Sequence, residues 1–373
     1  MANLQQDPPT AGAPAGREGQ DRSIIANPAM ESGLFTTTTL IEGVRTRYPV
    51  PSLIRDTFFA GRDYVNAEVV QVDTYRGGRG LAPFVLPLEG QVIGRRRPFG
   101  RTFVEAPIIA PARVITLREA NRPGWGETPY GFKTPEERVA EMYANDTQEM
   151  DDEIARTEEY MCCKTMFTGK VPINYRNKTS IVIDYGFTNT TVLAKKWTDP
   201  TANPLNDLMV AQNALNANGY SGNIAIYSPQ SWAACWNNTN VQNLMKNLSG
   251  LTPISSYTLG QSLPAGVAYA PSFSYPVMTN IIYSGTYVKN GVAVPYVPAD
   301  SVLIGSSNVK NRLVYAQVVQ IEQEDGNFHT YLSDRVPKVE CNVNKNFYMY
   351  TLTARPVPVP IDLLCWTVLT NCV

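Results

Sequence analysis

The residues of this chain that could do chemistry are few and scattered. There is one histidine, His329, which excludes a zinc site of the HExxH type and any metal site built from several histidines. Nucleophilic catalysis would have to bring this histidine beside a serine or cysteine in a pocket. The sequence also has no GxxxxGK phosphate loop, no GxSxG elbow and no DTG or DSG motif. We therefore predict that the protein is not an enzyme and uses no cofactor and no metal ion.

The cysteines do not form a recognisable redox or metal-binding pattern. None of them belongs to a CxxC pair, so we interpret all as reduced thiols. Cys162 and Cys163 are neighbours in a segment of helical character, where they would act as small apolar residues. The six positions are Cys162, Cys163, Cys235, Cys341, Cys365 and Cys372.

One cluster of charge is dense enough to need an explanation, namely Arg95, Arg96, Arg97 and Arg101. We favour inter-subunit contact, in which the guanidinium groups pair bidentately with carboxylates of a neighbour. Contact with nucleic acid is a second reading, although there is little aromatic interleaving. A plain solvated loop is the third reading, because exposed charges usually contribute little.

Length and composition describe an ordinary folded protein. The 373 residues suggest two or three domains, and 43% of them are hydrophobic. The formal net charge of −1 argues against a protein that works by coating nucleic acid, which usually needs a basic excess. The apolar stretch Ile361–Leu369 is far shorter than the ~20 residues of a membrane-spanning helix, so no membrane partner is expected.

The first third of the chain lacks the pattern of a compact domain. Residues 1–33 are rich in Gln, Pro, Ala and Gly, which predicts a disordered or loosely held tail. Residues 34–63 form a short arm broken by Pro49 and Pro51. Residues 64–112 have strand character punctuated by glycines. Such a β-excursion looks unstable alone and makes sense if it lies on a neighbouring subunit.

The rest of the chain gives clearer signals. Thr134-Pro135-Glu136-Glu137 supplies an N-cap, a proline at the first helical position and a capping-box partner, which predicts a helix over about 135–168. Gly169 is a plausible stop. Between residues 205 and 237 a helix, a buried strand and a second helix follow one another. Asn290-Gly291, between Thr286–Lys289 and Val292–Val294, predicts a tight hairpin.

The order of these motifs resembles one family, the lambda-type major capsid proteins of tailed bacteriophages (major capsid protein E family). The resemblance is carried by YSGTYVKNG…PADSVLIG between residues 283 and 305, and it extends from Leu34 to Val373. Further matching segments are Pro51–Phe59, Gln91–Ile93, Lys164–Lys170 and Ile226–Trp232.

This resemblance implies an α+β, HK97-like capsid fold. Its parts would be an N-arm (34–63), an extension loop (64–112), a peripheral domain with the long spine helix (113–200), an axial domain (201–340) and a return to the peripheral domain (341–373). It also implies that Phe58 and Phe59, at the end of the arm, contact another subunit, as we expect for the arginine cluster.

The same resemblance implies a structural function. Copies of the chain would form hexamers and pentamers that close an icosahedral head around double-stranded DNA, without sequence-specific binding. The expected partners are other copies of the chain, a scaffold, a portal at one vertex and a decoration protein. The protein would be assembled in the host cytoplasm and end in the virion. The alternative is the shell protein of a cellular compartment with the same fold, because fold alone does not fix function.

Overall fold

The computed structural model describes residues 49–74, 100–122, 133–175, 180–247, 264–273, 276–309, 311–321 and 326–373. The chain divides into two compact units. In the smaller unit the described residues are 115–122 and 133–142, which hold α3 (Leu117–Ala120) and the first turns of α4 (Pro135–Thr168). The larger unit contains residues 49–114 and 143–373. The predicted tail, residues 1–33, lies outside the described residues, as do 34–48 of the arm and 75–99 of the extension loop.

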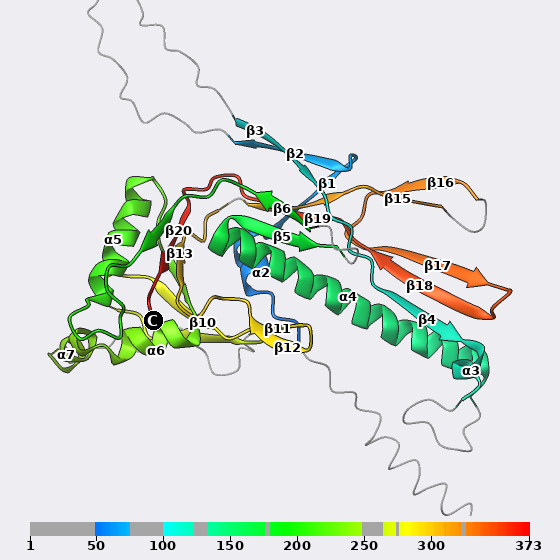
Figure 1. Cartoon of the computed structure of the whole chain (residues 1–373), viewed down its shortest axis with the longest axis horizontal. Helices are drawn as coiled ribbons and strands as arrows, with labels where there is room; N and C mark the ends of the chain where they lie inside the picture. Colours follow the sequence, from blue (N-terminus) through cyan, green and yellow to red (C-terminus); the bar gives the residue numbers. More distant parts are fainter. Residues whose placement is uncertain are drawn as a thin grey trace, which may run out of the picture. The chain divides into compact units, whose positions relative to one another are not determined.

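The long helix α4 begins and ends where the sequence predicts. The amide of Thr134 donates to Oε2 of Glu137 at 2.9 Å, and the amide of Glu137 donates to Oγ1 of Thr134 at 3.2 Å, so the capping box is confirmed. The helix then runs unbroken for 34 residues (Figure 1). It ends before Gly169, whose φ of +64° favours glycine, and where a Cβ would lie 2.2 Å from Cβ of Phe187.

The largest sheet has six strands in the order β7-β20-β13-β8-β10-β9. β8 runs parallel to β10, and β7 runs parallel to β20, while the other neighbours are antiparallel. The strands are β7 (Thr190–Val192), β8 (Ile224–Tyr227), β9 (Val267–Ala270), β10 (Thr279–Tyr283), β13 (Val302–Gly305) and β20 (Trp366–Thr370).

Alternate side chains of this sheet enter two different cores. Ala225 and Tyr227 belong to one core, and Ile224 and Ile226 belong to the other, as strand geometry requires. We call the first the α5 core, because α5 (Pro204–Ala217), α6 (Pro229–Asn237) and α7 (Thr239–Asn247) contribute to it. We call the second the α4 core, because α4 and α2 (Leu53–Phe58) contribute to it. Figure 1 shows α5 on one side of β20 and β13, with α2 and α4 on the other.

The predicted hairpin is confirmed. β11 (Thr286–Lys289) pairs antiparallel with β12 (Val292–Pro295), with Lys289 opposite Val292. The two turn residues have positive φ, +52° for Asn290 and +78° for Gly291. Two such residues form the type I′ turn whose twist matches the flanking strands.

The remaining strands form small sheets and ribbons. One three-stranded sheet has β14 (Arg312–Ala316) between β1 (Gly61–Val65) and β19 (Pro356–Val359). Another has β18 (Phe347–Thr353) between β17 (Val336–Asn342) and β4 (Ala112–Thr116). The two-stranded ribbons are β2 (Val69–Thr74) with β3 (Gly100–Glu105), β5 (Lys170–Asn174) with β6 (Ser180–Asp184), and β15 (Val318–Ile321) with β16 (Phe328–Tyr331).

Strand pairing crosses the boundary that we predicted between residues 340 and 341, where the axial domain would end and the return to the peripheral domain would begin. β17 ends at Asn342, across that boundary, and pairs with β18. The last strand, β20, returns to the six-stranded sheet, where it pairs with β13 and β7. A strand inserted between two others by pairing with residues far away in the sequence leaves no local signal, which is why the boundary and the pairing differ.

The base of the predicted extension loop also differs from the expectation of a ribbon without a core. The side chains of β2 and β3 point alternately to the two faces of the ribbon. On one face Val70, Val72 and Val104 are each at most 5% exposed. They pack with residues of α4, β5, β6, β14 and β19 in a third core. The opposite face of the ribbon carries Val69 and Phe103, which are 43% and 65% exposed. The ribbon therefore has one face packed on its own protomer and one exposed face, on which Val69 and Phe103 lie among polar and charged residues.

Candidate functional site

Two adjacent carboxylates on α4, Glu158 and Glu159, are fully buried. Charged residues are almost never fully buried unless they are paired, because leaving water costs several kcal/mol per ion. These two glutamates therefore require hydrogen-bond donors or positive charges inside the larger unit. Their partners come from segments far apart in the sequence.

Glu159 binds the beginning of helix α2. Its Oε1 accepts from the amide of Ile54 at 2.9 Å, and its Oε2 accepts from the amide of Arg55 at 2.8 Å. The hydroxyl of Tyr283, in β10, donates to Oε1 at 2.8 Å. Ser52, the residue before α2, makes no side-chain capping bond. A carboxylate 105 residues away thus satisfies amides that a local cap usually satisfies.

Glu158 binds two arginines and a tyrosine. Arg335 Nη1 donates to Oε1 at 2.7 Å, and Arg55 Nη1 donates to Oε2 at 3.1 Å. The hydroxyl of Tyr315, in β14, donates to Oε1 at 3.0 Å. Arg335 also donates through Nε to Asp151, two helical turns nearer the beginning of α4, at 2.6 Å. We call Glu158, Glu159 and their partners the carboxylate clamp.

The clamp joins the arm, the six-stranded sheet and the β1-β14-β19 sheet to one helix. Its partners are hydrogen-bond donors, and those from α2, β10 and β14 lie on elements that contribute to the α4 core. Burial raises the pKa of Glu159, against the opposing effects of the Arg55 and Ile54 amides and the Tyr283 hydroxyl. The arrangement fixes the positions of segments and presents no side chain to a reacting molecule.

The cysteines are free thiols, and five of the six are buried. Cys162 and Cys163 lie in α4 and contribute to the α4 core, as predicted. Burial raises the pKa of Cys162 and Cys163 and brings that of Cys235 and Cys365 to about 12. These four thiols therefore stay protonated at neutral pH and act as apolar residues rather than nucleophiles.

Phe58 and Phe59, predicted to contact another subunit, lie inside their own protomer. Each is 1% exposed and belongs to the α4 core. Phe58 packs so closely on β13 that a Cβ at Gly305 would lie 2.9 Å from its Cε1. The inter-subunit interpretation is therefore corrected for these two rings. It treated the arm as an exposed segment, whereas α2 turns its apolar side onto the sheet.

Of the predicted arginine cluster, the structure describes one member. Arg101 is exposed in β3, in register with Asp73 of β2. Arg95, Arg96 and Arg97 lie outside the described residues. Their inter-subunit role stays a prediction.

One feature of the sequence indicates the burial of Glu158, although we did not predict it. Glu158 lies four residues after Ile154 and four before Cys162, both of which are fully buried. A residue at that spacing belongs to the same face of the helix. A carboxylate inside an apolar stripe is therefore buried, and it requires donors.

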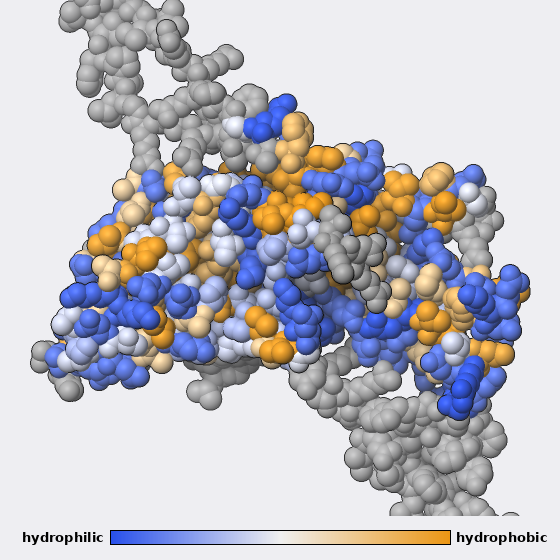
Figure 2. All heavy atoms as spheres, viewed as in Figure 1, coloured by the Kyte–Doolittle hydropathy of each residue, from blue (hydrophilic) through white to orange (hydrophobic). Residues whose placement is uncertain are grey.

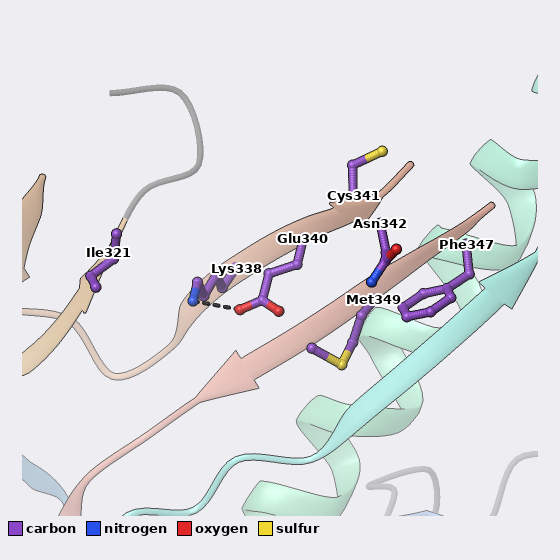
Figure 3. A pocket seen from close by; sticks show the side chains of 7 residues that line it. All are labelled: Ile321, Lys338, Glu340, Cys341, Asn342, Phe347 and Met349. Atoms are coloured by element: carbon purple, nitrogen blue, oxygen red, sulfur yellow. Dashed lines mark ion pairs between the residues drawn. The ribbon is translucent and has the colours of Figure 1, made fainter. Parts of the chain in front are cut away.

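A shallow pocket lies beside the hairpin of β17 and β18 (Figure 3). Its volume is about 400 Å³, and an ion pair between Lys338 and Glu340 crosses part of it. The lining residues are Ile321, Lys338, Glu340, Cys341, Asn342, Phe347 and Met349. They come mainly from one exposed hairpin and do not bring a nucleophile beside a base, so the pocket offers no site for the chemistry considered above.

In the part of the chain that the structure describes, no cluster of three or more His, Cys, Asp or Glu side chains is arranged to hold a metal ion. Among the helices of that part, none combines the length and the apolar character needed to cross a bilayer.

The clamp predicts a large loss of stability when Glu159 is truncated. Glu159→Ala leaves the amides of Ile54 and Arg55 and the hydroxyl of Tyr283 without their acceptor, which costs about 3–5 kcal/mol of unfolding free energy. Glu149→Ala, an exposed site on the same helix, is the matched control and should change stability by less than about 0.5 kcal/mol. Urea denaturation of the unassembled protein measures both. Equal effects of the two variants would contradict the clamp.

The raised pKa of Glu159 predicts a pH dependence of definite sign. Above the ordinary glutamate pKa of about 4.3, the folded state keeps a proton that the unfolded state has lost. The stabilisation is therefore complete below that pH and is lost as pH rises through the folded pKa. The unfolding free energy of wild type minus that of Glu159→Gln should fall as pH rises above about 4.3. A difference that rises with pH would contradict the assignment.

Comparison with known proteins identifies the family. The family model of phage major capsid protein E matches residues 36–340. The major capsid protein of Escherichia phage lambda is 21% identical over 313 residues, which cover 82% of this chain and 89% of that protein. The major capsid protein of Enterobacteria phage phi80 is 23% identical over 303 residues, which cover 78% of this chain and 86% of that protein.

A solved structure shows the fold. The crystal structure of the putative capsid protein of a prophage of E. coli CFT073 superposes with a TM-score of 0.62 at 17% identity, covering 90% of this chain and 97% of that one. The predicted α+β, HK97-like capsid fold is thereby confirmed. Since the family model matches well over half of the sequence, the chain belongs to the phage major capsid protein E family, and it is a structural component of the virion shell rather than an enzyme.

Proposed function

We propose that this capsid protein assembles as hexamers and pentamers into an icosahedral head that encloses double-stranded DNA. The observation that carries the proposal is the family match, which begins in the arm and runs through most of the body of the fold. Assembly of such proteins into shells with copies of themselves belongs to the family. Its phage relatives favour a phage head over a cellular compartment.

The exposed surface of the larger unit supports contact between copies. In Figure 2 hydrophobic residues gather in the upper middle of the view, where Figure 1 places β1, β2 and β6. The exposed apolar side chains on these strands are Tyr64, Val69, Ile181 and Val182, each between 39% and 53% exposed. Contiguous apolar surface of this kind marks interaction sites in soluble proteins.

We propose that the extension loop makes its main contacts with another copy of the chain. Thr74 and Gly100 are still paired at the last described position of the ribbon. The chain between them, residues 75–99, therefore leaves from two adjacent strands whose outer face exposes Phe103. Covering the exposed Val69 and Phe103 with a neighbouring subunit would add stability to the ribbon.

The remaining partners belong to the same proposal. A scaffold, a portal at one vertex and a decoration protein would take part in assembly. The net charge of −1 suits a wall that encloses DNA without binding it tightly, since tight non-specific binding requires a basic excess.

Deletion of the loop tip tests the proposal without damage to the body. Residues 75–99 would be replaced by Asn-Gly, which closes a two-residue turn between the paired residues Thr74 and Gly100. The buried Val70, Val72 and Val104 are retained, so we expect a folded protomer with a far-ultraviolet circular dichroism spectrum like that of wild type. It should form no closed shells in negative-stain electron microscopy. Normal shells from this variant would contradict the proposal.

The arginine cluster predicts weaker shells when its charge is removed. Replacing Arg95, Arg96, Arg97 and Arg101 together by Ser should lower the salt concentration at which purified shells dissociate, because the remaining surface pairs are screened. A matched variant with Lys at all four positions keeps the charge but loses bidentate pairing. If the contacts are bidentate and inter-subunit, shells of the Lys variant should also dissociate at a lower salt concentration than wild-type shells. Unchanged dissociation of both variants would assign the cluster to solvent.

A further inference from the structure

A buried arginine lies where the extension loop leaves the body. Arg355 follows β18 and is 5% exposed. The preceding residue, Ala354, exchanges two backbone hydrogen bonds of 2.9 Å with Ile109, just beyond β3. The carbonyl of Arg355 accepts from the amide of Ala316 at 3.0 Å. Three passes of the chain therefore meet at this arginine.

Its guanidinium reaches both sides of the base of the ribbon. Nη2 donates to the carbonyl of Ala106 at 3.2 Å, directly after β3. Nη1 donates to Oε1 of Glu68 at 3.2 Å, directly before β2, and to the carbonyl of Gln317 at 3.1 Å. Ala106 and Glu68 are themselves joined by a backbone hydrogen bond of 3.1 Å. The planar guanidinium thus connects the residue before β2 and the residue after β3 with Gln317, which lies between β14 and β15.

Stability alone does not explain a charge at this place. Its carboxylate partner, Glu68, has a side chain that is 62% exposed, which weakens the ion pair by solvent screening. Nε of Arg355 is buried and has no hydrogen-bond partner among the described residues. A buried ion that is only partly compensated is often replaceable by an apolar residue without loss of stability.

The apolar contacts of the ribbon and its contacts with the guanidinium have different effects. Val70, Val72 and Val104 hold the ribbon on the third core through non-directional burial. The rigid fork of an arginine instead fixes the relative position of the acceptors that it contacts. Arg355 therefore adds a directional side-chain contact at the base of the ribbon that the core packing does not supply.

We propose that Arg355 is a positioning residue for shell assembly, which fixes the direction of the β2–β3 ribbon at its base. This inference rests on the proposed function, in that the ribbon must reach a neighbouring copy. Removal of the guanidinium leaves a folded protomer whose ribbon has lost its fixed direction. Such a protomer presents the loop to its neighbour in the wrong orientation.

The test compares three full-length variants with wild type. Arg355→Met keeps the length and apolar stem, Arg355→Lys keeps the charge, and Arg312→Met is the matched control. Arg312, the exposed first residue of β14, pairs with Asp63 of β1, and the two side chains are 49% and 40% exposed. The measurements are the yield of closed shells by sedimentation and negative-stain microscopy, and amide hydrogen exchange of the unassembled protein.

For Arg355→Met we expect at least a tenfold lower shell yield and at least tenfold faster exchange in residues 69–74 and 100–105. Exchange in residues 150–166 of α4 should be unchanged. Arg355→Lys should recover part of both losses, and Arg312→Met should behave as wild type. If Arg355 only stabilised the fold, its replacement would speed amide exchange throughout the larger unit.

Two results would overturn the inference. One is a normal shell yield from Arg355→Met. The other is faster exchange across the whole unit, or unfolding, in both the Met and the Lys variants. Failure of the proposed function is distinguishable, because it would appear as normal shells from the protein that lacks residues 75–99. In that case the ribbon is not needed at all.

Discussion

The fold depends on two adjacent carboxylates that have to be buried in the same helix turn. Glu158 and Glu159 lie among the apolar residues of α4, and a buried carboxylate without donors is too costly to keep. Their donors are the first amides of α2, two tyrosine hydroxyls and two arginines. The arm and two sheets must therefore reach α4 together, which makes the larger unit around the clamp a single packed body.

The packed body and the β2–β3 ribbon have different roles in a shell subunit. The described part of the arm belongs to the protomer, because Phe58 and Phe59 complete the α4 core. The β2–β3 ribbon is different, because only one of its faces is packed on the protomer and the other exposes Val69 and Phe103. The outer face of the ribbon is thus available for contact with a neighbour. A shell subunit needs both, a body that keeps its form and an element that reaches out.

Much of this fold could be predicted because its signals are local. The bounds of α4 follow from a cap, a proline and a glycine within the segment itself, and the hairpin follows from Asn290-Gly291. The pairing of β20 with β13 and β7, the burial of Phe58 and Phe59, and the clamp were not predicted. Each of these depends on partners far away in the sequence, and Glu159 meets its amides across 105 residues. Only the position of Glu158 within an apolar stripe was visible beforehand.

We expect this chain to close into a shell in which the ribbon of one copy lies on the next. Cryo-electron microscopy of the assembled particles tests it most directly. We expect an icosahedral shell of hexamers and pentamers in which α2 remains in its own protomer and residues 75–99 lie against a neighbouring copy. Small discrete oligomers, or a shell in which residues 75–99 contact only their own protomer, would contradict the account.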